Sequence, residues 1–219
     1  MRNVNFQDIL GSMEEQFAIR QAKFVTSAGT EGNYPEALPC EIAIVGKSNV
    51  GKSSLINRLT NNQKLAKTSS QPGKTRLVNF YLLNQSLYLV DLPGYGFAKA
   101  SKTEQKSWGE LLDKYLTSGR VKHLFMLIDI RHAPTQDDLM MFRYLIYYNI
   151  PYTLIATKSD KIAKTKRKQE ANKRAKELGA PPFAMPFSSE TGEGKAELLN
   201  RIGQIYNDFT AIQKESSEE

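Results

Sequence analysis

An eight-residue segment between Gly46 and Ser53, GKSNVGKS, fits the pattern G-x-x-x-x-G-K-[ST]. Gly46 and Gly51 permit backbone conformations that turn amide N–H groups towards phosphate oxygens, and a helix beginning near Lys52 would add the positive end of its dipole. The Lys52 ammonium would reach the β- and γ-phosphates of a nucleotide, and the Ser53 hydroxyl would ligate Mg²⁺. The pattern predicts a phosphate-binding loop made of Gly46, Lys47, Ser48, Asn49, Val50, Gly51, Lys52 and Ser53.

A second polar segment, TKSD at residues 157–160, follows an apolar run and indicates which base the nucleotide carries. The Asp160 carboxylate would accept hydrogen bonds from the ring N1–H and the exocyclic amino group of guanine, and adenine has neither donor in those places. TKSD alone also fits a solvated Asp at a helix start, and the later segment SSE also fits a helix cap. The residues expected to surround guanine are Thr157, Lys158, Ser159, Asp160, Phe187, Ser188 and Ser189.

Two further segments are suited to sensing the terminal phosphate. Asp91, at the end of an apolar run, would hold Mg²⁺ through a water, and the Gly94 N–H would touch the γ-phosphate. The Thr75 hydroxyl would join Ser53 on the same ion, with Thr68 and Ser70 as rival ligands. Both loops would be ordered by the γ-phosphate and released on hydrolysis. The residues expected to contact the nucleotide are Gly73, Lys74, Thr75, Arg76 and Leu77 in the upstream loop, and Asp91, Leu92, Pro93 and Gly94 in the downstream loop. The predicted Mg²⁺ ligands are Ser53, Thr75 and Asp91.

Alternating apolar and helical stretches position these segments. Strands are predicted at residues 41–45, 78–83, 87–91, 123–130, 152–157 and 183–187, and helices at 52–61, 103–117, 136–148, 165–178 and 195–209. This alternation predicts an α/β fold with helices flanking the sheet. Only three residues join strands 78–83 and 87–91, so these two must be antiparallel. The expected sheet is mixed and six-stranded, with five parallel strands and one antiparallel edge strand.

Composition limits the class of protein. Lys and Arg outnumber Asp and Glu by 30 to 23, and the formal net charge of +7 points to an anionic partner, nucleic acid before membrane or acidic protein. One cysteine excludes an internal disulfide framework, and no apolar run approaches the ~20 residues of a membrane span. The chain ends lack a signal peptide and a prenylation motif. These features predict a cytoplasmic protein that does not engage a membrane.

The order of the four segments looks like that of a P-loop GTPase, in which they make up the G domain. Their sequences, GKSNVGKSSLIN, TSSQPGKTRLVNFY, DLPGYGFAK and TKSD, resemble the EngB (YsxC/YihA) ribosome-biogenesis GTPases of the TrmE-Era-EngA-EngB-septin-like superfamily, as does AKFVTSA near the N-terminus. The resemblance implies GTP/GDP binding with Mg²⁺, a role in assembly of the large ribosomal subunit, and a link to cell division and septation. We expect an N-terminal extension (1–39) with a helix over 7–23, a G domain (40–210) and an acidic disordered tail (211–219).

The residue after the DLPG segment is Tyr95, where many small GTPases have a water-positioning Gln. A phenol positions water poorly, so the chain would hydrolyse GTP slowly, use a partner, or use another cation. The resemblance to relatives with Asn in G-x-x-N-x-G-K-S implies that Asn49 helps bind K⁺ near the phosphates, although Asn49 could instead only shape the loop. The candidate catalytic residues are Lys52, Asn49, Thr75 and Gly94.

Residues 161–176 contain eight cationic side chains and one opposing carboxylate, Glu170. On a helix they would form either a solvated face or a salt-sensitive, sequence-nonspecific contact with ribosomal RNA phosphates. We therefore favour a monomeric GTPase that docks on the large ribosomal subunit or its RNA. A signalling GTPase with a protein effector is the main alternative, and a P-loop ATPase or nucleotide kinase, against which TKSD argues, is the third.

Overall fold

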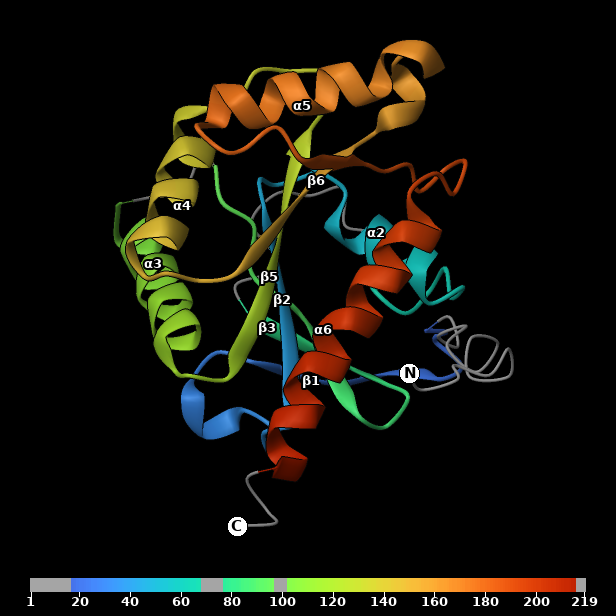
Figure 1. Ribbon diagram of the computed structural model, residues 1–219. Coiled ribbons are helices and arrows are strands. Elements are labelled where there is room, and N and C mark those ends of the chain that lie inside the picture. Colours follow the sequence, from blue (N-terminus) through green and yellow to red (C-terminus); the bar gives the residue numbers. More distant parts are fainter. Residues whose placement is uncertain (1–16, 68–76, 97–101, 216–219) are drawn as a thin grey trace, which may run out of the picture.

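In the computed structural model, the described residues are 17–67, 77–96 and 102–215. Over these residues the chain forms one seven-stranded sheet in the order β1-β3-β4-β2-β5-β6-β7, with helices on both faces (Figure 1). The strands are β1 (Ala22–Ala28), β2 (Cys40–Gly46), β3 (Val78–Leu83), β4 (Leu87–Asp91), β5 (Val121–Asp129), β6 (Tyr152–Thr157) and β7 (Ala184–Pro186). The α/β class and the mixed sheet are as predicted.

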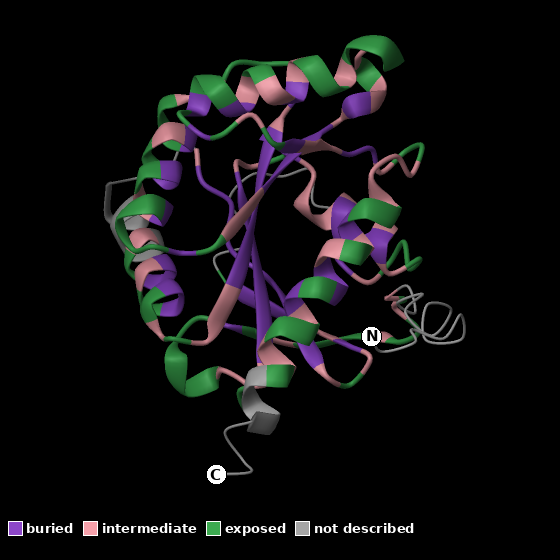
Figure 2. Cartoon of the chain, in the orientation of Figure 1, coloured by how far each residue is buried: buried purple, intermediate pink, exposed green. Residues whose placement is uncertain are grey.

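The helices divide between the two faces of the sheet. They are α2 (Lys52–Leu59), α3 (Lys102–Thr117), α4 (Gln136–Tyr147), α5 (Arg167–Leu178) and α6 (Lys195–Glu215), with short 3-10 turns η1 (Glu31–Asn33), η2 (Ser159–Lys161) and η3 (Lys164–Lys166). Buried side chains of α3, α4 and α5 share one core cluster, and those of α2 and α6 share the other. Figure 2 shows buried strands between helices whose outer faces are exposed.

The central strand β2 explains the continuous apolar runs. Ala43 and Val45 belong to the cluster under α3–α5, whereas Ile42 and Ile44 belong to the cluster under α2 and α6. Successive side chains of a strand point to opposite faces, so a strand covered on both faces needs apolar residues at every position. This arrangement places Gly46 at the edge where the carboxyl ends of β2, β4, β5 and β6 meet.

The antiparallel strand is not at the edge, which corrects the prediction. β3 runs antiparallel to both β4 and β1, and β1, a seventh strand from the predicted extension, forms the edge. The Asn84 side chain accepts from Arg20 N at 2.8 Å and donates to Ala18 O at 2.8 Å, which ties the start of β1 to the β3–β4 turn. The sheet therefore includes a strand from the predicted N-terminal extension (1–39) and does not begin at residue 40.

Two predictions for the chain ends need correction over the described residues. Residues 17–21 are not helical and β1 begins at Ala22, so the helix predicted over 7–23 is wrong in that part; residues 7–16 lie outside the described ranges. Helix α6 continues to Glu215, so residues 211–215 of the predicted disordered tail are helical, and 216–219 lie outside the described ranges.

His123 should make the stability of the fold depend on pH. The ring is 3% exposed in β5, and its Nε2 lies 2.8 Å from Thr153 Oγ1. Burial, with a contribution from Arg201, lowers the pKa of His123 to about 4. Between these pH values the His123 imidazole is protonated in the unfolded chain but stays neutral in the folded chain. The free energy of unfolding should therefore fall by at most about 3 kcal/mol as the pH drops from about 6.5 to 4.

Urea unfolding of native protein and His123→Gln at several pH values measures this loss. The Gln amide keeps a partner for Thr153 and cannot take a proton, so the variant should lose less stability over this range. Equal pH slopes for the two proteins would show that another group is responsible.

Candidate functional site

The phosphate loop connects the end of β2 to the start of α2. Gly51, just before the helix, has a φ of +112°, which a residue with a side chain adopts only under strain. Asn49 has a φ of +61°, and its carbonyl accepts a hydrogen bond from Lys158 Nζ at 2.9 Å. These two positive φ values bend the loop directly before α2, so the positive end of the helix dipole lies next to the loop.

Asp91 and Gly94 lie beside this loop because β2 and β4 are parallel neighbours, with Ile44 opposite Asp91. The Lys52 Nζ stands 3.7 Å from Asp91 Oδ1. A Cβ added at Gly94 would lie 3.2 Å from Lys52 Nζ, so the backbone of Gly94 approaches the lysine as closely as its lack of a side chain allows. The phosphate loop and the downstream segment 91–94 thus lie side by side, as predicted.

The Asp91 carboxylate has the character of a metal ligand. Burial raises its pKa, and the Lys52 charge acts in the opposite direction. Its Oδ1 is buried without a hydrogen-bond partner among the described residues. A buried carboxylate oxygen without a donor is costly, and Mg²⁺ or its water shell would satisfy it. The Asp91 carboxylate therefore fits a Mg²⁺ ion, and Ser53, the other described residue of the predicted ligand set, is the second residue of α2.

The second half of the site lies where β6 ends. The Thr157 hydroxyl donates to Val50 O at 2.7 Å, which ties this strand to the phosphate loop. Asp160 Oδ1 accepts from Ser188 Oγ at 2.8 Å, and Oδ2 pairs with Lys161 Nζ at 3.1 Å. Partial burial alone would raise the pKa of Asp160, but the hydrogen bonds from Ser188 and Lys161 outweigh it and lower that pKa. Asp160 is therefore an ionised acceptor at neutral pH.

Backbone and side-chain contacts join the SSE segment to the TKSD segment. Ser159 N donates to Phe187 O at 3.1 Å, and the Ser159 hydroxyl donates to the Glu193 carboxylate. Arg167 Nη1 pairs with the same Glu193 oxygen at 3.0 Å. Ser188 N donates to Glu193 O at 3.1 Å. The structure therefore brings together residues 157–160 and 187–188 of the predicted guanine site, and Glu193, which the motif analysis missed, supports both segments.

A cavity of about 280 Å³ opens beside the phosphate loop, on the side of the β5–α4 connection. It is lined by Lys47, Ser48, Asn49, Val50, Ile128, Asp129, His132, Ala133, Pro134, Thr135, Asp138 and Lys158. The phosphate-loop residues and Lys158 belong to the predicted motifs, whereas the lining residues that follow β5 belong to none of them.

Comparisons with known proteins agree with this geometry. The family model described as "50S ribosome-binding GTPase" matches residues 41–158. A relative from Oceanobacillus iheyensis, named a probable GTP-binding protein EngB, is 47% identical over 189 residues, which are 85% of this chain and 97% of the relative. The chain belongs to the EngB family of GTP-binding proteins. It is accordingly a GTPase with a guanine-nucleotide site.

Solved structures show the same fold. A crystal structure of a probable GTP-binding protein EngB is 24% identical, with a TM-score of 0.64 over 77% of this chain and 100% of that chain. Era in complex with MgGDPNP and nucleotides 1506–1542 of 16S ribosomal RNA is 25% identical, with a TM-score of 0.60 over 74% of this chain and 55% of Era. The fold described above is therefore shared with Era, whose solved complex contains ribosomal RNA.

Tyr95 has a structural part in this EngB-family site. Its ring is 4% exposed, its hydroxyl donates to Asp138 Oδ1 at 2.7 Å, and its carbonyl accepts from Ser48 N at 2.9 Å. Burial, the Asp138 carboxylate and its hydrogen bond raise the pKa of Tyr95, which keeps the hydroxyl a donor. Because the side chain points into the core, it does not take the water-positioning place of a Gln.

Some predicted site residues cannot be placed. Gly73, Lys74, Thr75 and Arg76, and the rivals Thr68 and Ser70, lie outside the described residues. Leu77 is described and stands just before β3, 39% exposed. The upstream phosphate-sensing loop of the EngB-family chain therefore stays a prediction.

Gly94→Ala should impair this EngB-family GTPase in its GTP-bound state more than in its GDP-bound state. The new Cβ would lie 3.2 Å from Ser48 N and 3.3 Å from Gly46 O, where a γ-phosphate contact is predicted. Such crowding should lower the affinity for a nonhydrolysable GTP analogue by about tenfold or more, and the affinity for GDP by much less.

Titration calorimetry with both nucleotides measures the difference. Gly109→Ala is the matched control, because no atom of the described part of the chain lies within 4 Å of a Cβ at that helical position. Equal losses for GDP and for the analogue would contradict a γ-phosphate contact at Gly94.

Proposed function

We propose that this GTPase is a nucleotide-controlled factor in assembly of the large ribosomal subunit. Its GTP-bound form docks on the subunit or its RNA, and hydrolysis releases it. The family model's description as a 50S ribosome-binding GTPase supports the partner, and the Era complex shows RNA bound to a protein of similar fold. The observation that carries the proposal is a group of exposed lysines next to the guanine site.

Contacts within the structure sort the cationic side chains of residues 161–176 into two groups. Arg167 pairs with Glu193, and Arg174 pairs with Glu170 and Glu177, so both arginines have structural partners. The remaining six are lysines on exposed positions of η2, η3 and α5: Lys161, which also pairs with Asp160, and Lys164, Lys166, Lys168, Lys173 and Lys176. The outer face of α5 is largely exposed (Figure 2). Flexible ammonium groups of this kind suit sequence-independent contacts with RNA phosphates.

Mg²⁺ is the proposed cofactor, held by Ser53 and Asp91 with Thr75 as a third ligand. When bound, the ion would neutralise charge on the β- and γ-phosphates. Lys52 binds the same phosphates, the Gly94 N–H contacts the γ-phosphate, and the helix dipole of α2 adds a fixed positive potential. Because the Tyr95 side chain is turned away from this space, it does not orient water there, and we expect slow intrinsic hydrolysis.

K⁺ is proposed as an activating ion near the phosphates, with the exposed Asn49 side chain as a ligand. A cation at that place would stabilise transition-state charge. GTP hydrolysis should be faster in KCl than in NaCl, and Asn49→Ala should remove the difference. Equal rates of the native protein in both salts would exclude the ion.

We further propose that the chain is a cytoplasmic monomer needed for normal division and septation, as the ribosomal role of the family implies. Within the described residues, no helix has the length and apolar character to cross a bilayer. Depletion in cells should cause loss of large subunits before septation defects appear. Septation defects with normal subunit profiles would instead favour a signalling GTPase with a protein effector.

Sedimentation with purified large subunits tests the proposal. The native protein should co-sediment with a nonhydrolysable GTP analogue and not with GDP. Lys166→Glu with Lys168→Glu should weaken binding by about tenfold or more and flatten its salt dependence. Lys23→Glu with Lys64→Glu, which makes the same charge change at exposed positions elsewhere, should leave it unaltered. Binding that is independent of nucleotide, or equally weakened by both pairs, would contradict the proposal.

A further inference from the structure

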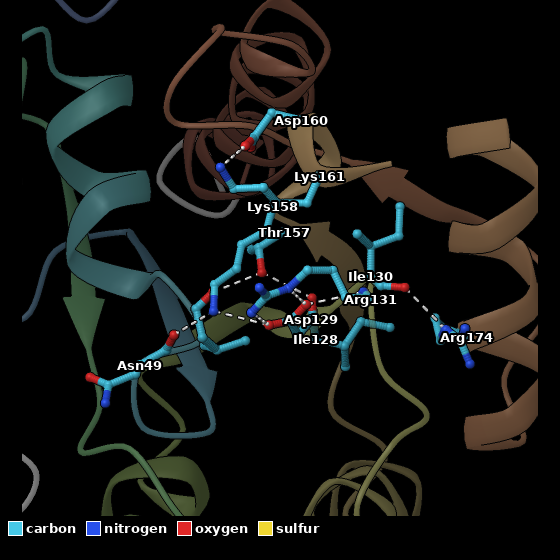
Figure 3. A network of polar contacts seen from close by, with 11 residues as sticks. Asn49, Ile128, Asp129, Ile130, Arg131, Thr157, Lys158, Asp160, Lys161 and Arg174 are labelled. Carbon is cyan, nitrogen blue, oxygen red and sulfur yellow. Dashed lines mark hydrogen bonds and ion pairs between the residues drawn. The ribbon is translucent and has the colours of Figure 1, made fainter. Parts of the chain in front are cut away.

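The Lys158 ammonium lies between two partners on different loops (Figure 3). Its Nζ donates to Asn49 O in the phosphate loop at 2.9 Å and to Asp129 Oδ2 at the end of β5 at 2.9 Å. Lys158 itself has a φ of +62° at the start of η2. Two contacts and an unusual backbone conformation thus fix the direction of a side chain whose apolar stem is expected to lie along the base.

Asp129 is in turn held in place by Arg131. The guanidinium donates from Nε to Oδ1 at 2.9 Å and from Nη2 to Oδ2 at 2.8 Å, and the Arg131 N–H adds a third bond to Oδ1 at 3.0 Å. The next carbonyl, Ile130 O, accepts from Arg174 Nε of α5 at 3.1 Å. This bidentate interaction with Arg131 fixes the orientation of the Asp129 carboxylate, with Oδ2 directed at Lys158.

We propose that Asp129 is a positioning residue for guanine-nucleotide binding, which holds the Lys158 ammonium on the phosphate loop while Arg131 orients the carboxylate. The base-binding lysine is thereby fixed before the nucleotide arrives. Without Asp129 the lysine would have to be ordered during binding, and the ordering cost would reduce affinity. This role concerns nucleotide binding and does not depend on the proposed ribosomal partner.

The same contacts contribute little to folding. The side chains of Asp129, Lys158 and Arg131 are 18%, 30% and 38% exposed, and ion pairs that water reaches this well stabilise a fold only weakly. They join three loops at one edge of the sheet, where the phosphate loop and the end of β6 meet the nucleotide. Removing the carboxylate should therefore loosen nucleotide binding and leave the melting temperature within about 2 °C of the native value.

A double-mutant cycle on the full chain tests the role. Release of fluorescent N-methylanthraniloyl-GDP should be about tenfold faster in Asp129→Asn than in native protein. In a Lys158→Met background, which keeps an unbranched stem and removes the ammonium, Asp129→Asn should change the release rate by less than about twofold. Melting temperatures are measured for all four proteins.

A second variant keeps the test decisive if Asp129→Asn does not fold. Arg131→Gln should speed release by about threefold in native protein and have no effect in the Lys158→Met background. An equal acceleration in both backgrounds, or no acceleration in the native background, would overturn the proposal, because Asp129 would then not act through Lys158.

Discussion

Asp160→Asn is expected to weaken GDP binding by about a thousandfold or more, with a melting temperature close to that of the native protein. The carboxylate offers only acceptors, and its hydrogen bonds with Ser188 and Lys161 keep it ionised. An amide in its place turns an N–H₂ group towards the donors of guanine, so one base contact becomes a clash of donors.

Xanthosine diphosphate provides the matched control for this variant. Xanthine carries a carbonyl where guanine carries its exocyclic amino group, so the amide should bind xanthosine diphosphate better than native protein does. Titration calorimetry of both proteins with GDP and with xanthosine diphosphate measures this change in base preference. A loss for GDP with no gain for xanthosine diphosphate would indicate damage to the site, and an unchanged GDP affinity would remove Asp160 from the base contact.

Arg120→Met should lower the free energy of unfolding by about 3–5 kcal/mol. Its partner Glu41 is fully buried at the start of β2, and Arg120 donates to both carboxylate oxygens, at 2.6 Å and 3.1 Å. The guanidinium also lies over the rings of Tyr34 and Phe80, at 5.7 Å and 5.8 Å. Among the described residues, removing the arginine leaves the buried carboxylate with only the Tyr115 hydroxyl as a side-chain donor, which is costly in a region of low dielectric.

Urea unfolding measures this loss, with Arg143→Met on the exposed face of α4 as the control. The double variant Arg120→Met with Glu41→Gln should recover much of the stability, because the Gln side chain carries no charge and can still accept from Tyr115. GDP affinity should change little, because Glu41 lies near the end of β2 that is opposite to the phosphate loop. A loss below about 1 kcal/mol would mean that the pair is effectively solvated.

The local signals of the sequence predicted the main elements of the fold. The strand before Gly46 is covered on both faces, so its sequence is a continuous apolar run. The glycine-rich pattern that follows it indicates a backbone with positive φ, which the structure has at Gly51. β1 was missed because most of its side chains are exposed at the sheet edge, so AKFVTSA carries neither an apolar run nor a clear alternation. Pairing with β3, rather than its own pattern, makes it a strand.

The supporting residues of the site could not be predicted, because their contacts join residues far apart in sequence. The hydrogen-bonded pairs Lys158–Asp129, Tyr95–Asp138 and Arg167–Glu193 are separated in sequence by 29, 43 and 26 residues. None of these pairs forms a spacing pattern, and each follows only from the order of strands in the sheet. Arg167, which the sequence groups with a basic surface, instead supports the guanine site.

The central claim is that the sheet edge between the phosphate loop and Asp160 selects guanine nucleotides. Titration calorimetry of the unmodified chain with GDP and with ADP, in Mg²⁺ buffer, tests it most directly. We predict that GDP binds at least about ten-thousandfold more tightly than ADP, because adenine leaves the Asp160 carboxylate without its base donors. Affinities for the two nucleotides within a factor of about ten would contradict the account.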